Sequence, residues 1–225
     1  MSVNLAVIPN DFGNYDPSNW SAYGADPQIN FLDPTVFRTP GHPSIWHRYP
    51  HTSADVNGAR ETDGRWYPCK AGDHIIFKCW EKTGPADNPA YNNDTHHGSR
   101  IGIDFCAPDP SRPGYIMIVA GALVNGVGYD DISIAGHYAS EGSNVPCNTP
   151  DWTQQIIDCI VPSGFNITEF VDWLQMRPEQ GDSAQGWFAD SELYLNPPFQ
   201  PKVLDFPFPK PHQVGAPVQL KLTRI

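Results

Sequence analysis

The chain has 225 residues, of which 17% are charged, and its 14 Lys and Arg against 25 Asp and Glu give a net charge of −11. This length is enough for one large domain with a substantial core, while the acidic balance argues against nucleic acid and anionic membranes as partners. No apolar run is long enough to span a bilayer. The 19 Gly, 24 Pro and near absence of helical periodicity favour an all-β fold of short strands and turns.

Alternation of apolar and polar residues with period two predicts strands along most of the chain. In chain order the predicted strands are 3–7, 29–37 (broken at Pro34), 44–48, 66–67, 74–82, 100–106, 115–123, 152–161, 168–176, 186–195 and 218–222. A short helix is the alternative for 115–123 and for 168–176. Turn-forming residues predict loops at 10–23, 50–62, 84–98 and 125–143.

The strand 74–82 is the best defined of these elements. It follows the turn 70–73, in which Gly72 is free to adopt a positive φ. Ile75, Phe77 and Cys79 share the more apolar face, which is expected to point inward. Four tryptophans are expected in the core: Trp20, Trp80, Trp173 and Trp187.

The five cysteines cannot all pair within one chain. Cys69 and Cys79 flank one turn, and Cys147 and Cys159 flank the entry to a later strand, so these two pairs are disulfide candidates. Buried free thiols are the alternative.

Three N-x-S/T sequons make Asn19, Asn93 and Asn166 candidates for glycosylation. Together with the candidate disulfides and the low lysine content, they favour an extracellular or cell-surface protein. Residues 2–9 are too short and lack the basic start of a signal peptide. The chain is therefore expected either to be cytosolic or to begin at a mature end.

Several short motifs occur in an order that resembles carbohydrate-binding modules of the family four, nine and twenty-two type. The matching stretches are Asn4-Leu5 with Asn10-Asp11-Phe12 and 20–24, then 41–45, then 70–73 leading into 75–83, then 149–154 with 161–164, and finally 186–195. The stretch 60–83 is also similar to uncharacterised archaeal surface-type proteins of this fold. The resemblance implies a single antiparallel β-sandwich, a jelly-roll of galactose-binding-like type, over 1–195. Residues 196–225 are then a Pro-rich extension that ends in an amphipathic strand.

A structural calcium ion often joins the first and last strands of such modules, so the resemblance also implies candidate calcium ligands. Asp190 matches the carboxylate of the last strand. Near the first strand only Asn10 and Asp11 offer oxygen ligands, because Gly13 stands where an acidic residue is expected. No other cofactor is expected.

No catalytic residue is predicted, because Gly-x-Ser-x-Gly and His-Glu-x-x-His are both absent. Asp130, Asp131 and Glu141 are better explained as turn residues than as a glycosidase pair. Glycan binding requires exposed aromatic faces beside polar groups. The aromatic candidates for such a site are Trp46, Tyr67, Tyr91, Tyr129, Tyr138 and Trp152.

The two terminal strands suggest self-assembly. An amphipathic strand that follows a Pro-rich spacer must complete a sheet in its own domain or in a neighbouring subunit. The apolar residues of these strands are Val3, Leu5 and Val7 at one end and Val218, Leu220 and Leu222 at the other. The first hypothesis is therefore a non-catalytic, glycosylated filament subunit that donates a terminal strand to another copy. The alternative is a lectin-like carbohydrate-binding module.

Overall fold

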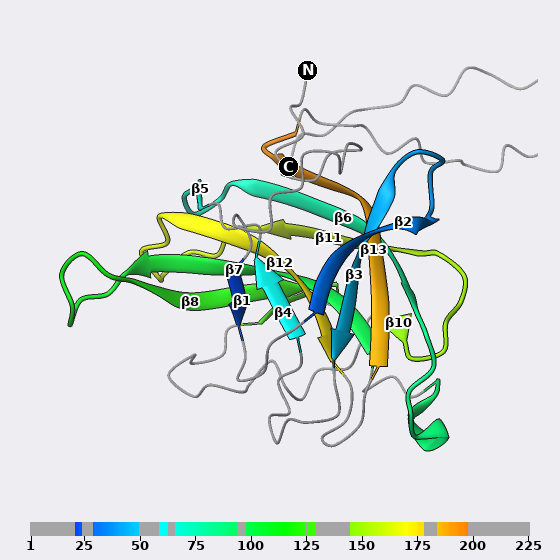
Figure 1. Ribbon diagram of the computed structural model, residues 1–225. Coiled ribbons are helices and arrows are strands. Elements are labelled where there is room, and N and C mark those ends of the chain that lie inside the picture. Colours follow the sequence, from blue (N-terminus) through cyan, green and yellow to red (C-terminus); the bar gives the residue numbers. More distant parts are fainter. Residues whose placement is uncertain are drawn as a thin grey trace, which may run out of the picture.

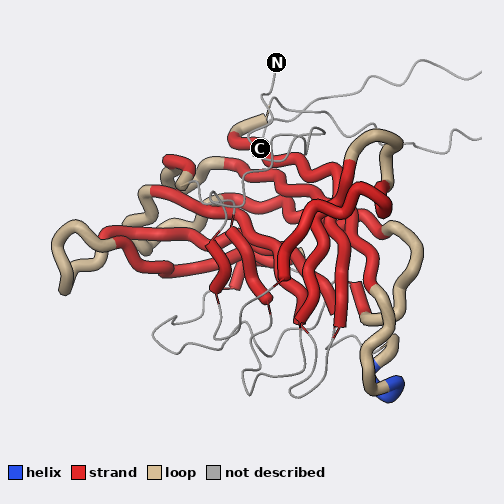
Figure 2. The backbone as a smooth tube through the Cα atoms, viewed as in Figure 1, coloured by secondary structure: helices blue, strands red, loops and turns tan. Residues whose placement is uncertain are grey.

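The computed structural model describes residues 21–23, 29–49, 59–62, 66–93, 98–124, 126–128, 145–177 and 184–197. These residues form two antiparallel β-sheets that pack face to face (Figure 1). They contain no α-helix, only the short 3₁₀-helix η3 (Pro89–Tyr91), and Figure 2 shows how completely strands dominate. The predicted β-sandwich of jelly-roll type is confirmed. No helix among the described residues has the length and apolarity needed to cross a membrane.

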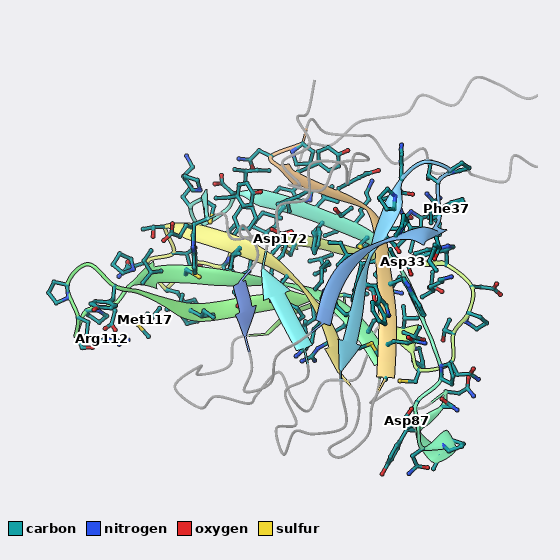
Figure 3. The ribbon with its side chains drawn as sticks, viewed as in Figure 1. Asp33, Phe37, Asp87, Arg112, Met117 and Asp172 are labelled. Carbon is teal, nitrogen blue, oxygen red and sulfur yellow. The ribbon has the colours of Figure 1, made fainter. Side chains whose placement is uncertain are left out.

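The first sheet, called sheet A, has the strand order β1-β4-β12-β7-β8-β9, with β10 also paired to β7 and β5 to β12. Its strands are β1 (Ser21–Tyr23), β4 (Ala59–Thr62), β5 (Tyr67–Pro68), β7 (Gly98–Pro108), β8 (Ile116–Leu123), β9 (Gly126–Gly128), β10 (Val145–Pro146) and β12 (Glu169–Arg177). The hairpin of β7 and β8 projects at one end, where Figure 3 labels Arg112 and Met117.

The second sheet, called sheet B, has the strand order β11-β6-β13-β3-β2. Its strands are β2 (Ile29–Phe37), β3 (Pro43–Tyr49), β6 (His74–Thr83), β11 (Thr153–Ile160) and β13 (Ala184–Leu195). The predicted strand 186–195, which is β13, therefore lies in the middle of its sheet, between β6 and β3. The register of β2 shifts between Asp33 and Phe37, the segment that contains Pro34.

The hydrophobic core lies between the two sheets. The alternation of β6 buries every second side chain, including Ile75 and Phe77. They belong to one cluster with Ile101 and Phe105 of β7 and Phe170 of β12. A smaller cluster at one end of the sandwich contains Ala86, Cys147, Met176 and Ala184.

Most predicted strands between residues 29 and 195 are confirmed, and 116–123 and 169–177 are strands rather than helices. Strand β4 was not predicted, because its sequence Ala-Arg-Glu-Thr has no apolar alternation. It is a strand because its backbone pairs with β12. The predicted terminal strands 3–7 and 218–222 lie outside the described residues, so they and the division at residue 195 stay predictions.

The two proposed disulfides are wrong in this structure, where none of the five cysteines forms a disulfide. Cys69 precedes the turn into β6, and Cys79 lies midway along that strand, about 17 Å beyond His74 at the usual rise per residue. Cys147 belongs to the smaller cluster, whereas Cys159 belongs to the main core at the far end of β11. Disulfide formation requires Cα atoms within about 7 Å.

Glu81 places a carboxyl group inside the sandwich, between the two sheets. Its Oε2 accepts a hydrogen bond of 2.6 Å from the hydroxyl of Ser99 on β7, and among the described residues its buried Oε1 has no hydrogen-bond partner. Burial raises the pKa of Glu81 to about 8, although the Ser99 hydrogen bond lowers it in part. The carboxyl group is therefore protonated in the folded protein at neutral pH.

We predict that stability declines with pH because of Glu81. The folded protein keeps this proton up to about pH 8, whereas an unfolded glutamate releases it near 4.5. The free energy of unfolding should therefore fall as the pH rises through this window, by up to about 5 kcal/mol. Glu81→Gln, which stays neutral, should remove most of this slope in urea unfolding curves between pH 5 and 9. Equal slopes in both proteins would contradict the assignment.

Candidate functional site

Strands β7 and β12 are buried on both faces, which sets them apart from the strands of sheet B. Their inner face supplies the core. Their outer face carries four buried polar or aromatic side chains, which we call the outer polar row: Arg100 and Asp104 of β7, and Trp173 and Gln175 of β12. Arg100 is 3%, Asp104 1% and Gln175 4% exposed.

Members of the outer polar row contact one another across the two strands. The Nε of Arg100 donates a hydrogen bond of 2.5 Å to Oε1 of Gln175. The indole Nε1 of Trp173 donates a hydrogen bond of 3.0 Å to Oδ1 of Asp104. The guanidinium carbon of Arg100 also lies 5.6 Å from the centre of the Trp173 ring, which is a cation–π distance. The row is thus a connected network.

The position of the Trp173 ring depends on Gly102. The two residues are directly paired, and a Cβ atom at position 102 would lie 1.9 Å from Cζ2 and 2.2 Å from Cε2 of the indole. No real Cβ approaches so closely, so only glycine lets the ring lie across β7. The indole is therefore held between Arg100 and Asp104.

Two glycines lie beside Asp104 on the outer face of sheet A. Asp104 pairs with Gly121 of β8, and Gly121 pairs with Gly128 of β9. Neither glycine has a side chain to cover the outer surface of the sheet. Residue 129 continues directly from Gly128, but the candidates Tyr129 and Tyr138 lie outside the described residues.

Sequence reasoning missed the outer polar row. Arg100, Gly102 and Asp104 alternate with core residues, and this pattern predicted a strand at 100–106 but no site on its polar face. The sequence did contain two signals. Trp173 and Gln175 lie two positions apart and so share one face of a strand, and the polar face of the strand 100–106 contains a glycine. Pairing between β7 and β12, which the sequence does not specify, brings the two halves together.

The four predicted glycan-binding aromatics that the structure describes do not gather at one site. Trp46 and Trp152 are partly buried and belong to the outer face of sheet B. Tyr67 stacks on Phe170 with ring centres 5.3 Å apart and packs against the main core. Tyr91 packs against the smaller cluster.

The expected core position of two tryptophans is wrong. Trp80 and Trp187 are partly buried on the outer face of sheet B. Trp80 alternates with the inward-facing Cys79 and Glu81, so the strand period places it on the opposite face. Trp173 is buried as expected, but on the outer face of sheet A, and Trp20 lies outside the described residues.

Two of the three candidate glycosylation sites are in the described part of the chain. Asn93 and Asn166 are both exposed, in loops, with positive φ angles of 65° and 51°. Asn19 lies outside the described residues. Glycosylation at all three positions stays a prediction.

Asp190, the candidate calcium ligand of the last strand, is already bound to a cation. Its Oδ2 accepts hydrogen bonds of 2.6 Å from Arg38 and 2.7 Å from the hydroxyl of Thr39. His42 Nδ1 lies 3.6 Å from Oδ1. The described residues contain no group of three or more His, Cys, Asp or Glu that could hold a metal. The guanidinium thus neutralises this carboxylate, and calcium binding at Asp190 stays a prediction. Asn10 and Asp11 lie outside the described residues, so their part in a calcium site stays a prediction.

We predict that Arg38 provides the positive charge that Asp190 needs. Arg38→Gln should lower the free energy of unfolding by about 1–3 kcal/mol, less than for a fully buried pair because Arg38 is partly exposed. Arg112→Gln, which removes the more exposed cation of the ion pair with Asp109, is the matched control and should change stability less, because Ser111 also donates hydrogen bonds to Asp109. If a calcium chelator lowers the melting temperature and Arg38→Gln does not, calcium neutralises Asp190 instead.

No family model matches the sequence, and a search of curated proteins gave no significant match. Among solved structures, a Stig cyclase from Fischerella sp. TAU is similar with a TM-score of 0.50 and 11% identity, over 88% of this chain and 99% of that chain. A xylan-binding CBM22 domain from Paenibacillus barcinonensis has a TM-score of 0.44 and 10% identity, over 86% and 98% of the two chains. The enzymatically active domain of bacteriophage CBA120 tailspike protein 4 has a TM-score of 0.47 and 14% identity. The match covers 85% of this chain and 21% of that chain. At these identities the likeness concerns the fold alone.

Proposed function

We propose that the chain is a glycan-binding module whose site is built on the outer polar row of sheet A. The observation that carries the proposal is the Trp173 indole, which lies across Gly102 with Asp104 on one side and Arg100 with Gln175 on the other. An aromatic ring surrounded by planar polar groups matches the chemistry of a sugar. The apolar face of a pyranose stacks on an aromatic ring, and its hydroxyl groups bond to amide, guanidinium and carboxylate groups.

Two glycines lie beside Asp104 on the same face of sheet A. Gly121 and Gly128 bring no side chains to this face, although Gly121 and Asp104 are themselves buried. Buried polar groups are costly unless they are bonded. The competing explanation is that the row is only a structural network that fixes the pairing of β7 with β12.

The described part of the row favours binding without catalysis. Glycosidases of the usual kind place two carboxyl groups on either side of the bond that they cleave. The outer polar row contains one, Asp104. Asp172, labelled on β12 in Figure 3, pairs with the core residue Ile103 and so belongs to the inner face. As for location, we propose an extracellular or surface-bound module, with the exposed Asn93 and Asn166 as attachment sites for glycans.

We predict that Gln175→Ala weakens glycan binding at least about tenfold, because it removes one planar hydrogen-bonding group and the hydrogen bond that this group makes with Arg100. A glycan array identifies a ligand for the wild-type protein, and calorimetry compares the variants. Gln155→Ala is the matched control, since Gln155 is a buried glutamine on β11 of sheet B. A row that is purely structural would instead give a lower melting temperature with unchanged affinity.

Self-assembly by strand donation is a second candidate, and the edge of sheet B favours it. Strand β11 pairs with β6 on one side and with no strand among the described residues on the other. Its outer face exposes Ile156 (42%) and Ile160 (53%), and the carboxylate between them, Asp158, is 2.7 Å from His74. An open, apolar edge without Lys or Pro readily accepts another strand. Residues 218–225, with apolar residues at alternate positions and Lys221 among them, have the pattern of such a strand.

We predict that deletion of residues 218–225 converts polymers of the wild-type protein into monomers, measured by light scattering. Leu220→Asp should have the same effect, because it would bring a charge into an apolar position of the sheet. Thr223→Asp adds the same charge on the other face of the strand and should leave assembly intact. Leu5→Asp applies the same test to the first strand. If the wild-type protein is monomeric at high concentration and these changes only lower its melting temperature, donation between subunits is excluded.

A further inference from the structure

The outer face of sheet B has features that glycan binding on sheet A does not explain. Four aromatic rings meet basic side chains on this face. Arg38 lies 3.7 Å from the ring centre of Trp80, and Lys78 lies 5.7 Å from that of Tyr194. Both cations also have carboxylate partners, Asp190 for Arg38 and Glu192 for Lys78, so their charges are neutralised locally.

Lys82 differs from these two cations. Its ammonium group lies 5.2 Å from the ring centre of Trp152 and 5.2 Å from that of Trp187. Within the described part of the chain it has no hydrogen bond and no ion pair. The two indoles thus hold a positive charge that is paired with no anion among the described residues, in a protein whose net charge is −11.

The polar groups around Lys82 are arranged asymmetrically. At one side, the side chain of Gln185 packs against Gly84, and its Nε2 would lie 2.8 Å from a Cβ atom at position 84. The side-chain amide of Gln185 makes no hydrogen bond to any described residue. At the other side, Nε1 of Trp187 donates a hydrogen bond of 3.0 Å to Asp33. Burial acts to raise the pKa of Asp33, but hydrogen bonds from Thr35 and Trp187 outweigh it and leave the pKa lowered. Because the Asp33 carboxylate is ionised, it repels a second negative charge. An anionic ligand is therefore favoured on the side of Lys82 where Gln185 lies.

We propose that Lys82, Gln185, Trp152 and Trp187 form a second binding site, which takes the acidic residue of a glycan. The indole edges and faces contact the sugar ring, the amide of Gln185 bonds to a hydroxyl group, and the ammonium group pairs with the negative substituent. Uronic acids and sulfated sugars share this chemistry. The site is independent of the outer polar row, which lies on the other sheet.

The test uses the full chain with three probes: an oligogalacturonate, a sulfated oligosaccharide and neutral xylohexaose. Calorimetry should show binding of at least one acidic probe, weakened at least about tenfold by Lys82→Gln and by higher salt. Lys78→Gln is the matched control, because it removes the same charge from the same strand face but leaves the site intact. Lys82→Arg should retain most of the affinity.

The outcomes separate the ligand and the site. Binding of the oligogalacturonate alone identifies a carboxylate ligand, binding of the sulfated probe alone identifies a sulfate ester, and binding of both identifies a general acidic sugar. Failure of both acidic probes, or equal effects of Lys82→Gln and Lys78→Gln, overturns the proposal. Gln175→Ala, which changes the sheet A site, should not alter binding of the acidic probes. Loss of function at the sheet A site can therefore be told apart from loss of function at the Lys82 site.

Discussion

The contact between the Trp173 indole and the backbone of Gly102 determines the arrangement of the outer polar row. It places an aromatic ring on the outer face of sheet A, where its Nε1 reaches Asp104 and its face lies near Arg100. Any larger residue at position 102 would require the ring to move. Because Gln175 is bonded to Arg100, such a movement would also disturb the opposite end of the row. The four residues are therefore coupled through one close approach between two strands.

Much of the fold follows from local sequence patterns. The alternation in 74–83 fixes which residues of β6 face the core, and the same period places Trp80 outside, against the expectation that large tryptophans are buried. Size alone was the wrong criterion there, because cation–π contacts with Arg38 allow an indole to remain at the surface. The short strand β4 could not be foreseen, since only its pairing with β12 makes it a strand.

The candidate site was less predictable than the fold for a physical reason. Arg100, Trp173 and Gln175 come from strands about 70 residues apart, and hydrogen bonding between the strands in one register makes them neighbours. A sequence shows which residues share a face of one strand, but not which strand lies beside it. Asp190 illustrates the same point, because its partner Arg38 is 152 residues away and takes the position that the family resemblance assigned to calcium.

The two sheets thus differ on their outer faces. Sheet A has a buried polar network, and sheet B has a half-buried group of aromatic and basic side chains.

The most direct test of the central claim is NMR spectroscopy of the indole N–H signals during titration with the glycan that the protein binds on an array. The account predicts that the Trp173 signal and the backbone amides of β7 and β12 shift together. Shifts confined to Trp80, Trp187 and the strands of sheet B would contradict a glycan site on the outer polar row.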